Sequence, residues 1–319
     1  MANPTPRLAD MAHNARVLVM HTFRNWVFRP PVNQGAGRQL APGNWIGIPP
    51  ANGIMAVGAE GVVHLWCDVD PTTQMIRDRV VVKHVVSGQV RYQDPFNWVN
   101  NQVGGEPLEC RQANLVWAAM PNATVQQHIQ PCLGWGDVVP PHVVAQTYQY
   151  KLYHEYCSHS SLNRVMKNQP KKKKKGAIRK GRKQFPEPFL WYMFESLAKA
   201  CVAMDRVYNG TGLVHQDIHP GNVFFGDPDP TRFAMYPVLK VADFGSAREL
   251  TNQVRNRGAI VQDDPVCLAY AAPENSWVVP IPVNQPLQWE APNMRISKKT
   301  NIYQRITGGY HRITTESPK

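Results

Sequence analysis

The stretch HQDIHPGN at residues 215–222, followed by DFG at residues 243–245, sets the interpretation of the chain. Asn222 and Asp243 supply hard oxygen ligands of the kind that Mg²⁺ takes when it holds phosphates. Asp217, five residues before Asn222 on the same predicted loop, can accept or orient the proton of an attacking hydroxyl. We expect the strand between Asn222 and Asp243 to return the chain to one pocket. A lone DFG is usually a turn, but this ordered set predicts a phosphate-binding site.

A lysine and a glycine-containing segment precede this stretch. Lys83 ends the β-branched run VVVK at residues 80–83, and the segment AVGAEGVV occupies residues 56–63. Its last glycine, Gly61, lies 22 residues before Lys83, and a Pro-Thr-Thr turn lies between them. Glycine is needed where backbone must approach phosphate oxygens closely. The two segments therefore predict a phosphate-covering turn beside a phosphate-binding cation.

Together these residues resemble the eukaryotic protein kinase family, and APE at residues 272–274 is similar to the end of its activation segment. The resemblance covers about residues 45–305, and residues 185–193 look like fungal kinases. It implies an α+β, two-lobed fold with a small antiparallel-sheet N-lobe and a mainly helical, incomplete C-lobe. It also implies phosphoryl transfer from ATP with Mg²⁺ to a protein hydroxyl, with Ser/Thr favoured as the acceptor.

The resemblance assigns a role to each matching residue. Lys83 would contact the α- and β-phosphates, with Glu109 or, alternatively, Glu106 as its acidic partner. Asp217 would orient the substrate hydroxyl, and Asn222 and Asp243 would hold the metal. The nucleotide would also be contacted by the glycine-containing turn, at Ala56, Gly58, Gly61 and Val63. A hinge at residues 152–157 would contact it through the backbone of Glu155 and Cys157, and His154 would take the gatekeeper position in this hinge.

Several positions depart from the family. Gln216 replaces the Arg that pairs with a phosphate on the activation segment. His219 replaces the Lys that neutralises the γ-phosphoryl group, which predicts reduced turnover. Residues 298–304 resemble the start of the long buried helix, with Asn301 in place of Asp, and the later helices and the Arg partner of Glu274 are absent. These departures leave open a pseudokinase that acts as a nucleotide-binding or interaction module. The string HPGN also leaves open a small-molecule kinase.

The hydrophobic pattern predicts a sheet followed by helices. We expect strands over residues 62–67 and 79–86, a helix over 108–120 that stops at Pro121, and one or two strands over 143–156. The clearest helix starts at Pro186 and Glu187 and ends at Gly210 and Gly212. Short strands follow near residues 223–225 and 239–242. The stripe expected on the core-facing side of the long helix is Leu190, Phe194, Leu197, Cys201, Met204 and Tyr208.

These elements give a domain plan. Residues 1–44 form an N-terminal extension with one short helix near residues 8–26. The kinase-like domain spans residues 45–305, with the N-lobe at 45–155, the C-lobe at 156–305 and a basic insert at 167–184. Residues 306–319 form a polar tail.

The basic character of the chain is confined to one segment. The chain has 319 residues with 35 basic and 23 acidic side chains, and residues 167–183 hold ten of the basic residues and no acidic one. Such a block is either a solvated, disordered insert or a patch for nuclear import or nucleic-acid contact. It lacks interleaved aromatic residues, so any nucleic-acid contact would be to phosphate. We favour a disordered insert that binds a nuclear import receptor.

The sequence also indicates the cellular setting. No apolar run approaches the roughly 18 residues of a membrane span, and residues 1–14 lack the apolar core of a signal peptide. The six cysteines are scattered without a Cys-x-x-Cys pair, which favours neither a zinc site nor a disulfide framework. We therefore expect an intracellular protein, cytoplasmic or nuclear, with no membrane partner. The protein substrate is not indicated.

Overall fold

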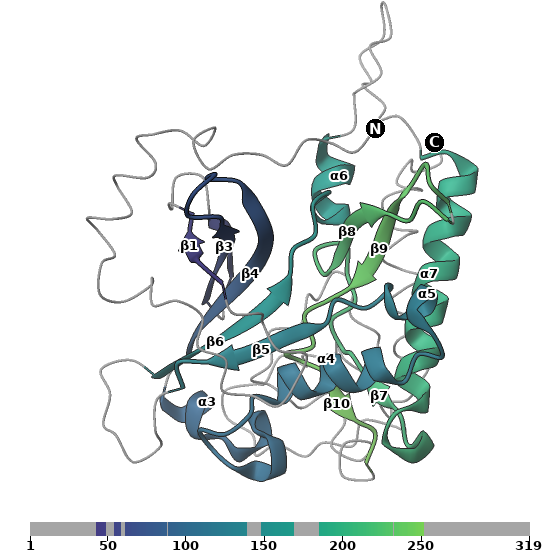
Figure 1. The fold of residues 1–319 in the computed structure, drawn as a ribbon. Coiled ribbons are helices and arrows are strands. Elements are labelled where there is room, and N and C mark those ends of the chain that lie inside the picture. Colours follow the sequence, from purple (N-terminus) through teal and green to yellow (C-terminus); the bar gives the residue numbers. More distant parts are fainter. Residues whose placement is uncertain are drawn as a thin grey trace, which may run out of the picture. The chain divides into compact units, whose positions relative to one another are not determined.

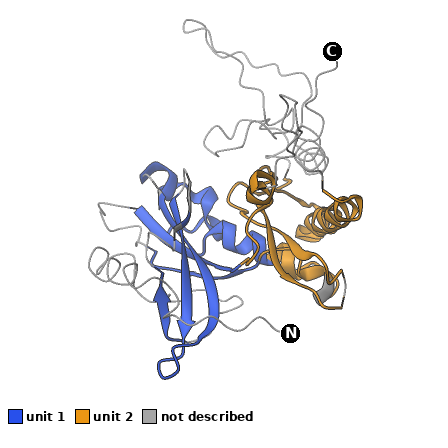
Figure 2. Cartoon of the chain, turned by 90° about the horizontal axis from the view of Figure 1, so that it is seen from above, with its two compact units in different colours: residues 1–114, 131–156 blue, residues 115–130, 157–319 orange. Residues whose placement is uncertain are grey.

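The computed structural model describes residues 43–48, 54–58, 61–87, 89–138, 148–168, 185–231 and 233–251. The chain divides into two units (Figure 2): unit 1 has residues 1–114 and 131–156, and unit 2 has residues 115–130 and 157–319. The sequence places the boundary between residues 155 and 156 and assigns residues 115–130 to the N-lobe. The N-terminal extension to residue 42, the basic residues 169–184, the APE string, residues 298–304 and the polar tail lie outside the described residues.

Unit 1 contains an antiparallel sheet with the strand order β1-β3-β4-β6-β5 (Figure 1). β1 pairs with the end of β3, and β2 pairs with the start of β3. Because these two strands share one position beside β3, the sheet is five strands wide. The strands are β1 (Trp45–Gly47), β2 (Ile54–Gly58), β3 (Gly61–Val69), β4 (Ile76–Ser87), β5 (Cys132–Gly136) and β6 (Tyr148–Glu155).

The hairpin of β3 and β4 confirms the two strands predicted at residues 62–67 and 79–86. The side chain of Asp70 closes its turn, because Oδ1 accepts hydrogen bonds from the backbone N–H groups of Thr72 (2.9 Å) and Thr73 (2.7 Å). Asp and Asn favour turns through such local bonds to the backbone. The resulting register pairs Val63 with Lys83.

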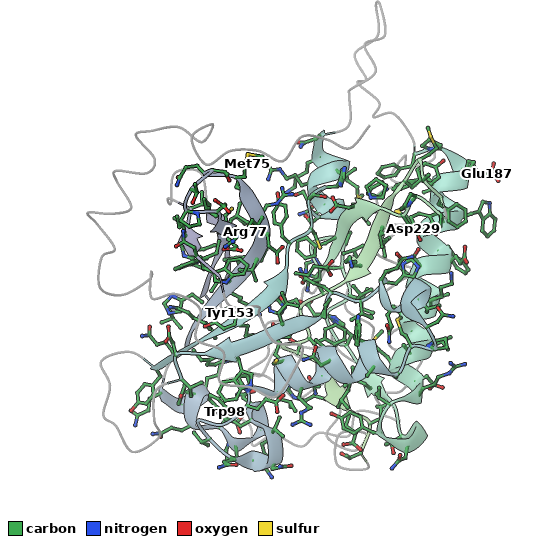
Figure 3. The ribbon with its side chains drawn as sticks, viewed as in Figure 1. Met75, Arg77, Trp98, Tyr153, Glu187 and Asp229 are labelled. Atoms are coloured by element: carbon green, nitrogen blue, oxygen red, sulfur yellow. The ribbon has the colours of Figure 1, made fainter. Side chains whose placement is uncertain are left out.

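The two faces of β4 carry different residues, because successive side chains in a strand point to opposite faces. Val80 and Val82 pack with Trp45, Trp66 and Tyr153 in a buried cluster; Figure 3 labels Tyr153. Lys83 follows Val82 and therefore lies on the other face of the sheet. The apolar cluster fixes the strand, and the strand places the lysine.

A set of short helices follows β4 and packs around Trp98, which Figure 3 labels. The Trp98 indole N–H donates to the carbonyl of Tyr92 (2.7 Å), and the ring packs edge-on against Tyr92. The predicted helix over 108–120 is confirmed as α4. The helices are α3 (Gln89–Gln93), η2 (Pro95–Asn97), η3 (Val99–Asn101), α4 (Leu108–Ala118) and, in unit 2, α5 (Ala123–Gln126).

The described part of unit 2 contains one long helix and two short strand pairs, β8 with β9 and β7 with β10. Phe189 and Tyr192 of the long helix pack against Val223, Phe225 and Leu239 of the β8–β9 pair. The strands expected near residues 223–225 and 239–242 are confirmed as β8 and β9. The elements are α6 (Leu162–Asn168), α7 (Glu187–Arg206), η4 (Tyr208–Gly210), β7 (Leu213–Val214), β8 (Val223–Pro228), β9 (Pro237–Val241) and β10 (Arg248–Glu249).

The face that α7 buries differs from the predicted stripe. Met204 is buried as expected, but Phe194 is 54% exposed. The buried residues are Phe189, Tyr192, Ser196, Ala200, Ala203 and Met204. The prediction was wrong because it followed the large apolar residues, whereas small Ser and Ala side chains form much of the packed face. Among the described residues, no helix combines the length and apolarity needed to cross a membrane.

Candidate functional site

Lys83 and Glu109 form a buried ion pair within unit 1. Lys83 Nζ donates to Glu109 Oε1 at 2.9 Å and to Oε2 at 3.0 Å, and the side chains are 11% and 5% exposed. Lys83 comes from the centre of β4, and Glu109 lies in the first turn of α4. Of the two carboxylates that the sequence leaves open, Glu109 pairs with Lys83. Glu106 precedes the helix and pairs with Arg111.

His154 lies beside this ion pair. It pairs across the sheet with Val81, so it shares a face with Lys83. Its Nε2 is 3.9 Å from Glu109 Oε1, and its side chain is buried. The residue that the resemblance puts at the gatekeeper position thus adjoins the carboxylate that holds the lysine.

The segment predicted to cover phosphates is a β-hairpin formed by β2 and β3. Ala56 pairs with Val63 and Gly58 with Gly61, and the connecting residues 59–60 lie outside the described residues. Gly61 has φ +151°, and a Cβ there would lie 1.9 Å from the carbonyl oxygen of His84. The strand contact itself therefore requires glycine at this position, whether or not a phosphate binds.

The two hinge residues fall in different units. Glu155 ends β6 and pairs with Val80 in unit 1. Cys157 is the first residue of this part of unit 2 and is buried. Its carbonyl accepts the N–H of Ser160 at 3.3 Å, and its Sγ accepts from Gln130 Nε2 at 3.7 Å. Local bonds in unit 2 therefore hold its backbone.

The loop of residues 215–222 lies in unit 2 and brings Asp217 and Asn222 together. Asn222 Nδ2 donates to the Asp217 carboxylate Oδ2 at 2.9 Å and to its carbonyl oxygen at 3.0 Å. Asn222 is 8% exposed and precedes β8, and its carbonyl accepts the N–H of Ala242 at 3.0 Å. The β8–β9 pair thus returns the chain to this loop immediately before Asp243.

His215 links the loop to the DFG string and was not assigned a role from the sequence. It is fully buried, its Nε2 lies 3.1 Å from the Ala242 carbonyl, and its ring packs 4.7 Å from that of Phe244. Burial lowers the pKa of His215, although the charges of Asp217 and Asp243 act to raise it. Both carboxylates therefore influence one buried imidazole. Only its place two residues before Asp217 could have indicated this role.

Two non-glycine residues of this site have left-handed backbone conformations. Gln216 has φ +65° and Asp243 has φ +63°. Such conformations cost on the order of 1–3 kcal/mol each and gather at functional sites, where packing enforces them. Gln216 directly follows His215, and Asp243 lies between the two contact residues of His215, Ala242 and Phe244. The strained backbone is therefore found where the loop of residues 215–222 meets the DFG string.

The ring of His219 is oriented toward Asp217. Its Nδ1 accepts the N–H of Gly221 at 2.9 Å, and its Nε2 lies 3.5 Å from Asp217 Oδ2. Nδ1 carries the lone pair in this arrangement, so the neutral ring has its proton on Nε2. The ring lies so close over Gly221 that a Cβ there would be 2.4 Å from its Cε1.

The oxygen atoms of this loop suit a hard cation. Because Nδ2 of Asn222 is used by Asp217, Oδ1 is the atom left to act as a ligand, together with the carboxylate of Asp243. Among the described residues no group of three or more His, Cys, Asp or Glu side chains could hold a metal ion. Two oxygen donors fit Mg²⁺, which usually completes its shell with water and phosphate oxygens.

Neither a scan against protein-family models nor a search of curated proteins finds a match to this chain. The assignment of function therefore depends on the residues themselves. Lys83 and Glu109 meet in unit 1. In unit 2, Asp217, His219 and Asp243 lie near enough to His215 for their charges to act on it, and Asn222 is bonded to Asp217. The first set offers a positioned cation, and the second offers an oriented carboxylate with two oxygen ligands.

Proposed function

We propose that this chain has a two-lobed protein kinase-like fold and transfers the γ-phosphoryl group of ATP, with Mg²⁺, to a protein hydroxyl. The observation that carries the proposal is the ion pair of Lys83 and Glu109. A lysine that is only 11% exposed needs an opposite charge to stay ionised and placed. Such a fixed cation suits the α- and β-phosphates of a nucleotide.

The second set of residues supports the same chemistry. Asp217 would orient the acceptor hydroxyl and take its proton, with its carboxylate held by Asn222. Asn222 Oδ1 and Asp243 would hold Mg²⁺, which neutralises phosphate charge when bound. His219 would present an N–H beside Asp217, where the kinase family has a lysine cation.

Nucleotide contacts complete the proposal. The backbone of the hairpin at Gly58 and Gly61 would cover the phosphates, and the backbone of Glu155 and Cys157 would contact adenine. Transfer to Ser or Thr is favoured over Tyr. The proposed location is the cytoplasm or the nucleus.

A direct test compares the full chain with its Asp217→Asn variant. The substrates are radiolabelled ATP with Mg²⁺ and, as acceptors, the chain itself, casein and histone. We expect the variant to lose at least about 100-fold in transfer while it keeps its affinity for Mg-ATP. Asp205→Asn, an exposed aspartate of α7, is the matched control and should transfer as the wild type does. Equal transfer by wild type and Asp217→Asn would refute the catalytic assignment.

A nucleotide-binding module without catalysis is the second candidate. It is favoured by His219, which stands where the kinase family has a lysine, and by Gln216, which offers no guanidinium to an activation-segment phosphate. A thermal-shift titration with Mg-ATP separates the two, because a ligand that binds the folded state raises the melting temperature. A shift without transfer supports the module, and no shift contradicts both candidates.

A further inference from the structure

The helix α7 carries large apolar side chains on a face turned away from its packed side. Trp191 is 64% exposed, Phe194 54% and Val202 48%. Together with Ala198 they follow spacings of three and four residues, which places the four side chains on one face of the helix. The buried residues of α7, such as Tyr192, lie on another side, which packs against β8 and β9 (Figure 1). The four exposed-face residues are called the outer stripe of α7.

Contacts within the helix hold the aromatic end of the outer stripe in place. The rings of Trp191 and Phe194 lie edge to face, with centroids 6.1 Å apart. The Trp191 indole N–H donates to Glu187 Oε1 at 3.2 Å, one turn earlier. Aromatic residues dominate the energy of protein interfaces, and side chains that are already ordered lose little entropy on binding. The outer stripe therefore has the character of an interaction surface.

The outer stripe is graded in size along the helix. Its N-terminal half holds the two aromatic side chains, Trp191 and Phe194, and its C-terminal half holds the smaller Ala198 and Val202. Two such helices in antiparallel order set the large side chains of each over the small side chains of the other. Parallel order would set Trp against Trp and leave a gap beside Ala198. The stripe is thus complementary to itself when the two helices run in opposite directions.

The charges on one flank of the stripe fit the same arrangement. Glu195 and Lys199 form an ion pair one turn apart, with Nζ 2.6 Å from Oε1. In an antiparallel pair with a two-fold axis at the level of Leu197, each flank meets the equivalent flank of the other helix. Glu195 then lies level with Lys199 of the second copy, because each is two residues from the axis. The result is a group of four alternating charges.

We propose that α7 pairs with α7 of a second copy of this chain, in a symmetric antiparallel dimer formed through the outer stripe. This interface does not depend on phosphoryl transfer. A helix of 20 residues is about 30 Å long and about 10 Å wide. The area it buries is below the roughly 800 Å² per partner of a standard interface. We therefore expect a weak, reversible dimer with a dissociation constant on the order of 10 μM.

The same geometry creates one unfavourable contact. Glu187 and Asp205 lie near opposite ends of α7, on the other flank of the stripe, and both are exposed. Across the two-fold axis, Glu187 of one copy approaches Asp205 of the other. Repulsion at these two exposed sites lowers the affinity modestly. Asp205→Lys turns both contacts into ion pairs and should tighten the dimer about three- to tenfold.

Sedimentation equilibrium of the full chain measures the association. Between about 1 and 200 μM we expect the weight-average mass to rise from the 36.0 kDa of one chain toward twice that value. Trp191→Glu should weaken the dimer at least about 100-fold, because it removes an aromatic anchor at two symmetric positions and puts a charge there. Val90→Glu is the matched control, since Val90 is 87% exposed but lies on α3. Circular dichroism verifies that both variants keep their fold.

Cysteine cross-linking tests the orientation of the two helices. Ala198→Cys and Val202→Cys are each made together with Cys201→Ala, which removes the native thiol of α7. Position 198 is next to the two-fold axis, so two copies of Ala198→Cys should join under mild oxidation. Two thiols at position 202 are about 15 Å apart along an antiparallel pair and should not join. Cys201→Ala alone gives the background.

The results that overturn the proposal are distinct. A monomer throughout the concentration range does so, and so does equal association of the wild type and Trp191→Glu. A monomer whose melting temperature falls in Trp191→Glu would mean that residues 252–319 of the same chain cover the stripe. Cross-linking of Val202→Cys as readily as Ala198→Cys would contradict the antiparallel order.

Discussion

Lys83 donates from Nζ to both carboxylate oxygens of Glu109, at 2.9 and 3.0 Å, across 26 residues of sequence. Both side chains are largely removed from water. The desolvation of two charges is costly, and their mutual attraction offsets much of this cost. Removal of one partner leaves a buried charge without its ion-pair partner, whereas removal of both leaves neither charge.

A double-mutant cycle follows from this balance. We expect Lys83→Met or Glu109→Leu alone to lower the free energy of unfolding by about 3–5 kcal/mol. The double variant should lose much less than the sum of the two, because it buries no unpaired charge. Urea denaturation of the four proteins measures the coupling. Losses that simply add would show that the two side chains do not interact in solution.

The hairpin glycine gives a second prediction, about stability. Gly61→Ala would place a Cβ 1.9 Å from the His84 carbonyl oxygen at φ +151°, so β3 must move away from β4. Gly210 also has a positive φ, +84°, but nothing lies within 4 Å of its Cβ position. Gly210→Ala should therefore lower the free energy of unfolding by only about 1–2 kcal/mol, which is the cost of a left-handed backbone conformation for alanine.

Thermal melts of both variants compare the two positions. The melting temperature of Gly61→Ala should be clearly lower than that of Gly210→Ala. Both variants bear the cost of the backbone conformation, but only Gly61→Ala also displaces a strand. Equal melting temperatures would mean that the close approach of Gly61 to His84 is absent in solution.

The orientation of His219 gives a third prediction. Gly221→Ala would put a Cβ 2.4 Å from the His219 Cε1, so the ring must turn and lose the hydrogen bond from the Gly221 N–H. Gly226→Ala is the control, because its Cβ meets the flexible end of Lys240. If the proposed function holds, a displaced ring lowers phosphoryl transfer about 10- to 100-fold.

Nitrogen NMR of the imidazole side chains reads the orientation independently of activity. In the wild type we expect the neutral His219 ring to show an unprotonated Nδ1 and a protonated Nε2. The signals should change in Gly221→Ala and stay unchanged in Gly226→Ala. A protonated Nδ1 in the neutral wild-type ring would contradict the contact with Gly221.

The sequence predicted site residues that lie close together along the chain, but it did not predict contacts that depend on how distant elements pack. The residue types and spacing of Asp217 and Asn222 indicated one loop, because a five-residue separation leaves little freedom. The choice between Glu106 and Glu109 stayed open, since they are three residues apart and either could face β4. It is settled by the start of α4 at Leu108, which leaves Glu106 outside the helix.

Residues without a strong pattern were missed for a related reason. The buried face of α7 uses Ser196 and Ala200, whose small side chains carry no hydrophobic signal. The partners of His215 are Ala242, which directly follows β9, and Phe244 of the DFG string, both more than 25 residues away. Neither could be derived from periodicity, because both depend on which elements pack together.

A fourth prediction concerns acid sensitivity of unit 1. His64 of β3 is buried, and its Nδ1 has no hydrogen-bond partner in the part of the chain that the structure describes. It is faced by His84 of β4 and Lys151 of β6; Lys151 pairs with Asp137, and His84 contacts Gln149. Burial, aided by the charges of His84 and Lys151, lowers the pKa of His64 to about 4.

The sign of the effect follows from proton uptake. An unfolded histidine takes up its proton near pH 6.5, whereas His64 in the folded chain does so only near pH 4. Between these values the unfolded state binds more protons, so the free energy of unfolding falls as the pH falls from about 6.5 to about 4. One such histidine contributes a slope of at most about 1.4 kcal/mol per pH unit. The lowered pKa values of His84 and His215 act in the same direction.

Urea denaturation at several pH values between 4 and 7 measures this slope. His64→Gln keeps a polar side chain but cannot titrate, so we expect a shallower loss of stability in acid, with part of the slope retained from the other histidines. His159→Gln replaces an exposed histidine and is the control for the loss of one imidazole. An unchanged slope in His64→Gln would contradict the prediction, because it would mean that the ring takes up its proton equally well in the folded and unfolded chain.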